Sequence, residues 1–489
     1  MQRKKFLYIL ALATAASLTL SVTGCNKAAN ADQSQTSEVQ SVVTGDIQTN
    51  EEIINSTGGE HAVEASGNTA EYSNVKITKT GDSSQNDEAD FYGDNAAVFA
   101  TDKATLTLNN VVVDTNGKHA NAVFSYGEGT TVNISDSVIT TSGNCSGGLM
   151  TTGGGTMNAS NLSIHTTGNS SAAIRSDRGS GTVTVDGGTY VTEGTGSPVI
   201  YSTADITVSN ASLESTTSEG VVVEGRNSVT LNNVSLTADN NKKNSDKSDC
   251  YNAVMIYQSM SGDASVGLAK FKMTGGTLTN KNGDIFFVNN TATDITLENA
   301  KIVNQDSSGV FLRAAAAGWG TEGSNGGKVN LYLKNQTQDG DIVVDKVSVL
   351  NMYLSSGSVY TGTVNGANEG SVYVEIESGS KWVLTGDSYI TSLTCEAGAV
   401  DLNGHTLYVN GTKYTDGSAS SGTAIEIKTE SSGKGDHGGK RDKPNGEKPG
   451  DPPSGEKPQG DPPAGDPPAG DPPQGGDGNE PPAKPDGEA

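Results

Sequence analysis

The feature that most constrains this chain is a column of residues that tolerate left-handed backbone and recur at a nearly fixed interval. The column comprises Asn110, Asp136, Asn161, Gly187, Asn210, Asn233, Gly275 and Asn299. The interval is 23 to 26 residues, apart from one longer gap with an insertion after Leu236. Asn, Asp and Gly adopt left-handed geometry more readily than other residues. A repeat of this period predicts a solenoid with one such bend in each turn.

Apolar residues flank every member of this column at strand spacing. The positions two and four residues before it are apolar in each repeat, as at Leu106 and Leu108, and another apolar residue follows three positions after it, as at Val113. This alternation is typical of half-buried strands. A sharp bend therefore joins two short strands.

A third apolar segment follows in the first repeats, at residues 95–99, 121–124, 148–150, 173–175 and 198–200. Three strands per turn make a coil, and coils stacked at about 4.8 Å pair their backbones and bury continuous apolar ladders. Leucine-rich and helical repeats require a helical spacing that is absent here. We predict an all-β fold, a right-handed parallel β-helix of three-strand coils with about a dozen rungs and disordered ends.

The two ends of the chain do not have the composition of a folded domain. Residues 1–24 have a basic start and an apolar run too short to span a bilayer, which is the form of a signal peptide. Residues 21–25 resemble the bacterial lipobox, which implies that Cys25 becomes a lipidated first residue; the alternative is an ordinary signal with an incidental cysteine. We expect a lipidated tether over 25–55, the β-helix over 56–415 and a disordered acidic tail rich in Gly, Pro and Asp over 416–489.

Charge narrows the range of partners. The formal net charge is −25, with 57 acidic against 32 basic residues and no basic stripe. Nucleic acid is therefore an unsuitable partner. The expected location is the cell envelope, with the exported chain held to the membrane by lipid on Cys25 and exposed at the surface.

The repeat region, residues 60–413, resembles the pectin-lyase-like right-handed β-helix of polysaccharide lyases, phage tailspikes and autotransporter passengers. Residues 382–388 (WVLTGDS) resemble a segment near the C-terminal end of autotransporter-type adhesins, and residues 401–406 (DLNGHT) resemble the last rungs of bacterial β-helices. The resemblance implies a surface protein, and this repeat pattern specifies a fold better than a function.

The catalytic sets of enzymes with this fold are not recognisable in the sequence. Lyases of the fold use clustered acids to hold calcium and an Arg or Lys base, and hydrolases use Asp residues on adjacent rungs with a His beside Gly. The Gly404-His405 pair lacks such acids, and we interpret it as an exposed turn. The acidic stretches 87–94 and 245–249 lack fixed ligand spacing, so calcium is indicated only weakly. No other cofactor is expected.

The cysteines other than Cys25 suggest neither a disulfide framework nor a metal site. Cys145 and Cys250 occupy the same repeat position about four rungs apart, or roughly 19 Å at the strand spacing, which is too far for a disulfide. Cys395 leaves an odd number. No zinc-ligand spacing is present, so no metal site is predicted.

The third strand of each coil supplies the predicted binding surface. If residues such as Val98 and Val123 face inward, the alternation turns their neighbours outward. The predicted outward row is Phe99, Phe124, Met150, Arg175 and Ile200, with Phe286 and Phe311 as a continuation. An exposed apolar row of this length marks a contact surface. The alternative is that residues 237–249 or 314–327 lie across it.

A polar cluster adjoins this row. Arg175, Asp177 and Arg178 follow one another at the end of a third strand, and Lys118, His119 and Glu128 are expected about two rungs away. Arginine forks of this kind could grip a carboxylated sugar. The plainer interpretation is a solvated salt-bridge patch.

Three functions remain open on the sequence. The first is a non-catalytic adhesive or polysaccharide-binding module that recognises extracellular polysaccharide or a host or neighbouring cell surface. The second is a divergent polysaccharide lyase or glycoside hydrolase acting on acidic glycans. The third is a passive structural protein of the wall or surface.

Overall fold

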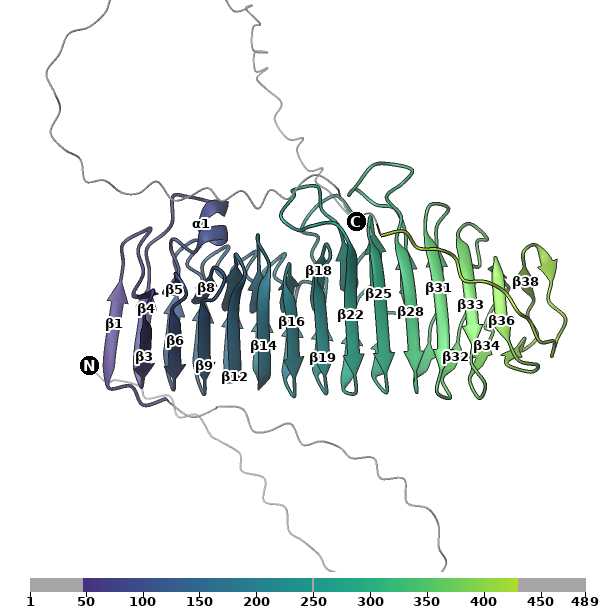
Figure 1. Cartoon of the computed structure of the whole chain (residues 1–489), viewed down its shortest axis with the longest axis horizontal. Helices are drawn as coiled ribbons and strands as arrows, with labels where there is room; N and C mark the ends of the chain where they lie inside the picture. Colours follow the sequence, from purple (N-terminus) through teal and green to yellow (C-terminus); the bar gives the residue numbers. More distant parts are fainter. Residues whose placement is uncertain (1–46, 249, 430–489) are drawn as a thin grey trace, which may run out of the picture. The chain divides into compact units, whose positions relative to one another are not determined.

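The computed structural model describes residues 47–248 and 250–429, and these residues form a parallel β-helix. Strands of successive coils stand side by side along the array, as Figure 1 shows. Each coil contributes a strand before the bend, a strand after it and a third strand. The predicted all-β class and parallel pairing are confirmed.

The strands before and after the bend form one 21-stranded sheet, here sheet A. The strands before the bend are β3 (Thr69–Ser73), β6 (Thr105–Asn109), β9 (Thr131–Ser135), β16 (Asp205–Ser209), β19 (Ser228–Asn232), β22 (Leu268–Thr274), β25 (Ala292–Glu298), β28 (Lys328–Lys334), β31 (Val349–Ser355), β33 (Ser371–Ile376) and β36 (Ser392–Cys395). Those after it are β1 (Glu51–Asn55), β4 (Val75–Lys79), β7 (Val112–Thr115), β10 (Val138–Thr141), β17 (Ser212–Ser215), β20 (Ser235–Ala238), β23 (Thr277–Asn280) and β26 (Lys301–Asn304). Strands β12 (Gly155–Thr166) and β14 (Gly181–Thr192) run through the bend and link the two sets.

The third strands form an 11-stranded sheet, here sheet B. It contains β2 (Val63–Ser66), β5 (Val98–Thr101), β8 (Val123–Tyr126), β11 (Leu149–Thr152), β13 (Ile174–Ser176), β15 (Ile200–Ser202), β18 (Val221–Glu224), β21 (Asn252–Tyr257), β24 (Asp284–Asn289), β27 (Leu312–Ala314) and β30 (Ile342–Val344). Two smaller sheets complete the last coils: β29 (Thr337–Asp339), β32 (Val359–Thr361), β34 (Lys381–Val383) and β37 (Val400–Asp401), then β35 (Ser388–Ile390), β38 (Leu407–Val409) and β39 (Thr412–Lys413).

The predicted bend column is left-handed at every one of its eight positions. Its φ angles lie between 48° at Asp136 and 74° at Gly187. Side-chain amides also link neighbouring bends, because Asn161 Nδ2 donates to Asp136 Oδ1 at 2.6 Å and Asn210 Nδ2 donates to Asp186 Oδ1 at 2.7 Å. Asn and Asp therefore serve the bend in two ways, through backbone tolerance and through a ladder of side-chain hydrogen bonds.

One continuous core fills the coils. It contains the predicted apolar pairs before the bend, such as Leu106 and Leu108, and the apolar position after it, such as Val113. These side chains have no exposed area. Because each coil buries its apolar edge only against its neighbours, the solenoid is stabilised by stacking rather than by a globular centre.

The coils begin and end slightly differently from the predicted limits. Strand β1 lies within the predicted tether, where it pairs with β4 from Glu51 onward. At the other end, Ser420 bridges Cys395, and Ile425 exchanges two hydrogen bonds with Asn351. Residues 416–429 therefore run back along sheet A, where Figure 1 shows a yellow-green segment crossing the strands.

The predicted signal peptide, the lipidation site at Cys25 and the tail from residue 430 lie outside the described residues. Within the described ranges, no helix is both long and apolar enough to cross a membrane.

Candidate functional site

The outer face of sheet B carries the predicted row, and strand pairing defines its members. Phe99 pairs with Phe124, Phe124 with Met150, and Met150 with Arg175. The preceding residues, such as Val98, belong to the core, so the outward direction predicted for these four positions holds. The exposure predicted for the three apolar side chains is wrong, because Phe99, Phe124 and Met150 are all buried in a separate cluster.

A short helix covers these three side chains. The acidic stretch 87–94 contains α1 (Asp87–Tyr92), which ends at Gly93. A Cβ at Gly93 would lie 2.5 Å from the Phe99 ring, and φ there is 77°, so this close approach requires glycine. The Thr152 hydroxyl also donates to the Phe91 carbonyl at 2.7 Å. We call residues 85–95 the first cover.

The row continues through different residues from those predicted. Arg175 pairs with Tyr201, while Ile200 pairs with Ile174 and faces the core. The sequence interpretation was one residue out of register here, and a one-residue shift moves a side chain to the opposite face. Phe286 and Phe311 are also core residues, with ring centroids 5.7 Å apart.

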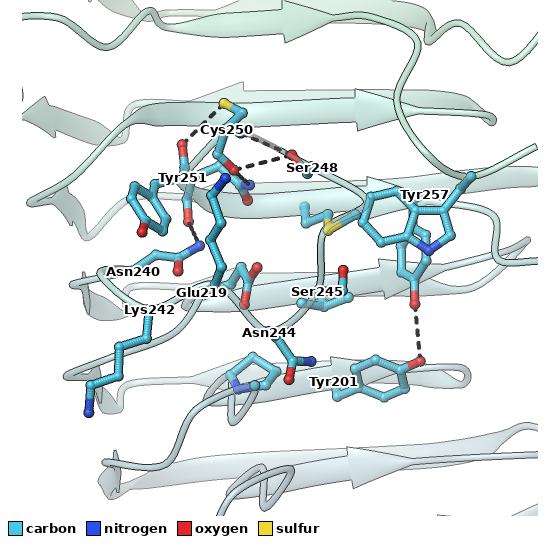
Figure 2. A pocket seen from close by; sticks show the side chains of 17 residues that line it. Tyr201, Glu219, Asn240, Lys242, Asn244, Ser245, Ser248, Cys250, Tyr251 and Tyr257 are labelled. Carbon is cyan, nitrogen blue, oxygen red and sulfur yellow. Dashed lines mark hydrogen bonds between the residues drawn. The ribbon is translucent and has the colours of Figure 1, made fainter. Parts of the chain in front are cut away.

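A second cover protects the rest of the row. After Tyr201, the outward positions are Val222, Met255 and Phe287. They form a second outer cluster with Tyr257, Ala315, Ala317 and Trp319. Residues 240–248, with Cys250 and Tyr251, also line a cavity of about 110 Å³ against the row, and Figure 2 shows Asn244 and Ser245 of this segment near Tyr201. The alternative of segments lying across the row is confirmed for this part, and we call residues 240–248 and 314–325 the second cover.

Between the two covers lies a cleft of about 300 Å³. Arg175, Tyr201 and Tyr257 contribute to it from sheet B. Its other lining residues come from the first cover, the turns before and after β13, the turn before β15, and the segments that hold Asn244 and Asp263: Asp87, Asp90, Phe91, Ser170, Ala172, Asp177, Gly196, Pro198, Asn244 and Asp263. The lining thus holds four carboxylates against one guanidinium.

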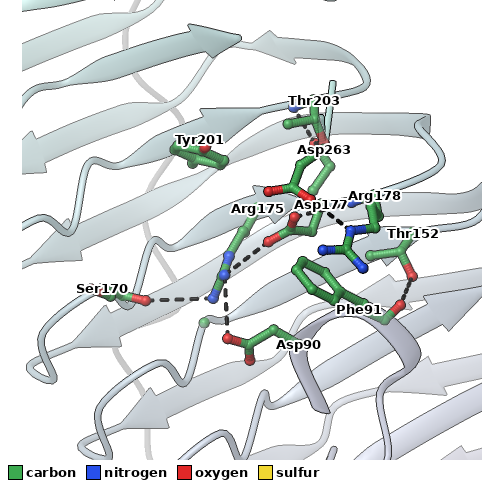
Figure 3. A network of polar contacts seen from close by, with 12 residues as sticks. Asp90, Phe91, Thr152, Ser170, Arg175, Asp177, Arg178, Tyr201, Thr203 and Asp263 are labelled. Atoms are coloured by element: carbon green, nitrogen blue, oxygen red, sulfur yellow. Dashed lines mark hydrogen bonds and ion pairs between the residues drawn. The ribbon is translucent and has the colours of Figure 1, made fainter. Parts of the chain in front are cut away.

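Arg175 is the centre of a largely buried ion-pair network, shown in Figure 3. Its Nη2 lies 3.0 Å from Asp177 Oδ2 and 3.4 Å from Asp90 Oδ2, and Nη1 donates to the Ser170 carbonyl at 3.5 Å. Burial opposes the charge of Arg175, but Asp90 and Asp177 outweigh it and raise the pKa. The guanidinium is therefore held by protein carboxylates, which argues against capture of a carboxylated sugar.

The two carboxylates beside Arg175 differ in their titration. Burial raises the pKa of Asp177 to about 6, with Arg175 acting against the shift and Asp90 and Asp263 adding to it. For Asp90, burial is outweighed by Arg175, His119 and Asn121, so its pKa lies below the usual value. Different pKa values for neighbouring acids are the pattern expected of functional sites and of structural ion-pair networks alike.

Arg178 bridges the first cover and the segment after β21. Its Nε donates to Asp263 Oδ1 at 2.6 Å, and its guanidinium carbon lies 3.6 Å from the centroid of the Phe91 ring. The side chain is 44% exposed, and its pairing with Glu88 is loose at 3.9 Å. Among Arg175, Asp177 and Arg178, Arg178 alone fits the interpretation as a solvated salt-bridge patch.

Two tyrosines meet a buried glutamate at the other end of the cleft. Tyr201 donates to Glu224 Oε2 at 2.5 Å, and Tyr257 donates to the same oxygen at 3.0 Å. Figure 2 shows the two hydroxyls directed toward each other, 3.4 Å apart. Burial, with the nearby Glu224, raises the pKa of both tyrosines, so the hydroxyls stay protonated as donors.

The structure separates the other predicted neighbours of this cluster. His119 is buried and its Nδ1 lies 3.1 Å from Asp90 Oδ2, whereas Lys118 and Glu128 are exposed. Of the two acidic stretches that weakly indicated calcium, residues 87–94 contain α1, whose Asp90 belongs to the ion-pair network of Arg175. Cys145, Cys250 and Cys395 are free thiols.

Sequence reasoning missed Asp90, Tyr201, Tyr257 and Asp263. Tyr201 follows from the correct register of β15, and a repeat alignment with Ile200 inward would have identified it. Asp90 and Asp263 lie in segments outside the repeat, so the repeat holds no signal for their positions.

The chain was compared with known proteins at three levels. It matches no protein-family model, no curated protein and no solved structure.

Proposed function

We propose that the protein is a surface module that binds polysaccharide in the cleft between the two covers. The supporting observation is the composition of that cleft. Aromatic side chains (Phe91, Tyr201 and Tyr257) lie among carboxylates and the Asn244 amide. Apolar rings with a few placed polar groups suit a sugar, which presents apolar ring faces and hydroxyls.

The charge of the cleft indicates which sugars it suits. Its single lining guanidinium, Arg175, is already paired with Asp90 and Asp177, and Asp87 and Asp263 add further negative charge. An acidic glycan would meet repulsion there. Neutral sugars and amino sugars are therefore the proposed ligands, in place of the acidic glycans considered from the sequence.

Binding of the full-length chain to an array of neutral, amino-sugar and acidic polysaccharides tests this proposal. Tyr201→Ala and Asn244→Ala are expected to weaken binding by about tenfold or more, because each removes a contact group from the cleft. Tyr332→Ala is the matched control, since Tyr332 stacks on Tyr353 at 4.9 Å on sheet A, away from the cleft. Retained binding in both cleft variants, or loss only in the Tyr332 variant, would contradict the proposal.

The proposed location is the outer side of the cell envelope, with a lipid on Cys25 as the anchor. The lipobox-like residues 21–25 support it, as does the likeness of residues 382–388 and 401–406 to bacterial surface β-helices. Cys25→Ser is expected to move the protein from the membrane fraction to the soluble fraction. An unchanged membrane fraction would exclude lipid attachment at Cys25.

Glycoside hydrolysis is a second candidate, favoured by one observation. Asp177 has its pKa raised to about 6 and lines the cleft with other carboxylates, and glycosidases need one protonated and one ionised carboxyl group. Release of reducing ends from the bound polysaccharide, abolished in Asp177→Asn, would establish hydrolysis. Binding without product formation would leave the non-catalytic module.

A further inference from the structure

Three side chains of different chemistry meet beside the cleft, on the side of the first cover. Asp90 belongs to α1, His119 to the turn before β8 and Cys145 to the turn before β11. One potential ligand atom from each lies within 4.8 Å of the other two. The side chains of Asp90 and His119 are 4% and 2% exposed, and Cys145 is half-buried. We propose that Asp90, His119 and Cys145 bind a divalent transition-metal ion of the zinc type.

The donor set and its spacing suit such an ion. Carboxylate oxygen, imidazole nitrogen and thiolate sulfur are the three ligand types of protein-bound zinc. Two tetrahedral ligands about 2.0 Å from zinc lie roughly 3.3 Å apart. Asp90 Oδ2 and His119 Nδ1 are 3.1 Å apart, which is close to that separation. Cys145 lies near enough to complete the set by a side-chain adjustment.

A neighbouring amide holds the carboxylate in place. Asn121 Nδ2 donates to Asp90 Oδ1 at 3.0 Å, which leaves Oδ2 as the oxygen that faces His119. Hydrogen bonds of this kind orient the ligands of metal sites. Asn121, in the turn before β8, therefore fixes the carboxylate through the oxygen that would not bind the ion.

The charges also balance around the ion. A doubly charged cation would be neutralised by the Asp90 carboxylate and the Cys145 thiolate, with the thiol proton released to solvent. Arg175 contacts the same Asp90 oxygen at 3.4 Å, but its nearer partner is Asp177 at 3.0 Å. Arg175 therefore keeps a counter-ion when the metal takes Asp90.

His119 and Cys145 stand at a turn position that successive rungs repeat. Both have φ of 57°, and Ser170 and Gly196 at the same position of the next two rungs have φ of 54° and 64°. The left-handed backbone at His119 and Cys145 therefore belongs to the turn of the coil. The two occupy the same turn position on consecutive rungs, 26 residues apart, which is why short-range zinc spacing in the sequence did not reveal them.

Titration of the metal-free, reduced full-length chain with Co²⁺, a spectroscopic substitute for Zn²⁺, tests the site. We expect one equivalent to bind with a thiolate-to-cobalt band in the near ultraviolet, and Zn²⁺ to displace it. Cys145→Ser should abolish the band and His119→Ala should weaken binding. Cys250→Ser is the matched control, because Cys250 is also half-buried at the same repeat position yet pairs with Asp284.

Several results would overturn the assignment: no cobalt binding, a band that survives Cys145→Ser, or a band lost in Cys250→Ser. Circular dichroism of each variant checks that the β-helix is retained. Should Cys145→Ser fail to fold, Asn121→Ala provides the test, with affinity expected to fall roughly 10–100-fold. Unchanged affinity in that variant would contradict the site. None of these measurements depends on polysaccharide binding.

Discussion

The two covers on sheet B protect the same row of outward side chains by different means. The first is a six-residue helix tied down by a buried charge, because Asp90 accepts from His119, Asn121 and Arg175. The second is formed by extended segments held mainly through neutral amides, as where Asn325 donates to two backbone carbonyls. The coil beneath is the same in both places. The difference shows that the covers, rather than the coils, make this face chemically distinct along its length.

Truncation of matched phenylalanines gives the largest expected effect on this comparison. Phe124 and Phe287 occupy equivalent outward positions, and both are at most 2% exposed. Phe124→Ala and Phe287→Ala should each lower the free energy of unfolding by about 3–5 kcal/mol, because each leaves a cavity beneath its cover. Denaturant unfolding measures the loss, and limited proteolysis shows which cover loosens. Protection of both covers in both variants would show that the clusters do not hold them.

Removal of the polar anchor of each cover, Asp90 or Asn325, should distinguish the two covers by the size of the stability loss. Asp90→Asn deprives Arg175 of one of its two carboxylates within a buried network, and we expect a loss of about 3 kcal/mol. Asn325→Ala removes two neutral hydrogen bonds and should cost about 1–2 kcal/mol. Hydrogen exchange of each cover reports the local effect. Equal losses would remove the distinction between a charged and a neutral anchor.

Asp177 lies in the cleft between the covers, and its titration should be visible as a pH dependence of the stability of the chain. Its pKa is about 6 in the folded chain against an ordinary 3.8, so the folded state holds this proton more tightly. The contribution of Asp177 to stability therefore falls as pH rises from about 4 to 6 and is constant above that, by an amount on the order of 2 kcal/mol. The difference in melting temperature between the wild-type chain and Asp177→Asn, measured from pH 4 to 7, isolates it. The melting temperature of the wild-type chain should fall relative to that of Asp177→Asn as pH rises from 4 to 6. A constant or rising relative melting temperature would contradict the assignment.

The smallest effect is expected on the exposed side of the first cover. Glu88 and Arg178 are 3.9 Å apart with roughly half of each side chain in solvent. Glu88→Gln should change the free energy of unfolding by less than about 0.5 kcal/mol, since Arg178 keeps Asp263 and the Phe91 ring. A larger loss in thermal unfolding would mean that surface charge also anchors α1.

The sequence predicted the inside of the coil far better than the outside of sheet B. Leu106, Leu108 and Val113 are buried as predicted because their burial follows from a period that every coil repeats. Phe124 points outward as predicted, yet it is buried because α1 covers it, and α1 is a helix too short to be stable without its tertiary contacts. The repeat pattern specifies the direction of a side chain, whereas an inserted segment decides what covers it.

The site was only partly accessible to the same reasoning. Arg175, Asp177 and Arg178 are neighbours in sequence, and the structure confirms that they share a polar network with the first cover. Tyr201 was missing from the predicted row because the segment before β15 is one residue longer than the predicted spacing of the third strands. A register error of one residue reverses a side chain but leaves the fold prediction intact.

The return of residues 416–429 along sheet A has a mechanical consequence. A force applied at residue 429 would reach the Ile425 to Asn351 hydrogen bonds first and would break them one after the other, as in peeling. The hydrogen bonds from Thr423 and Gly422 to the Ser392 and Thr394 side chains would take the load next, then the bridge between Ser420 and Cys395, and the terminal coil only after that. Weak contacts in series dissipate tension before it reaches the stacked strands. This segment therefore protects the C-terminal end of the solenoid by detaching first.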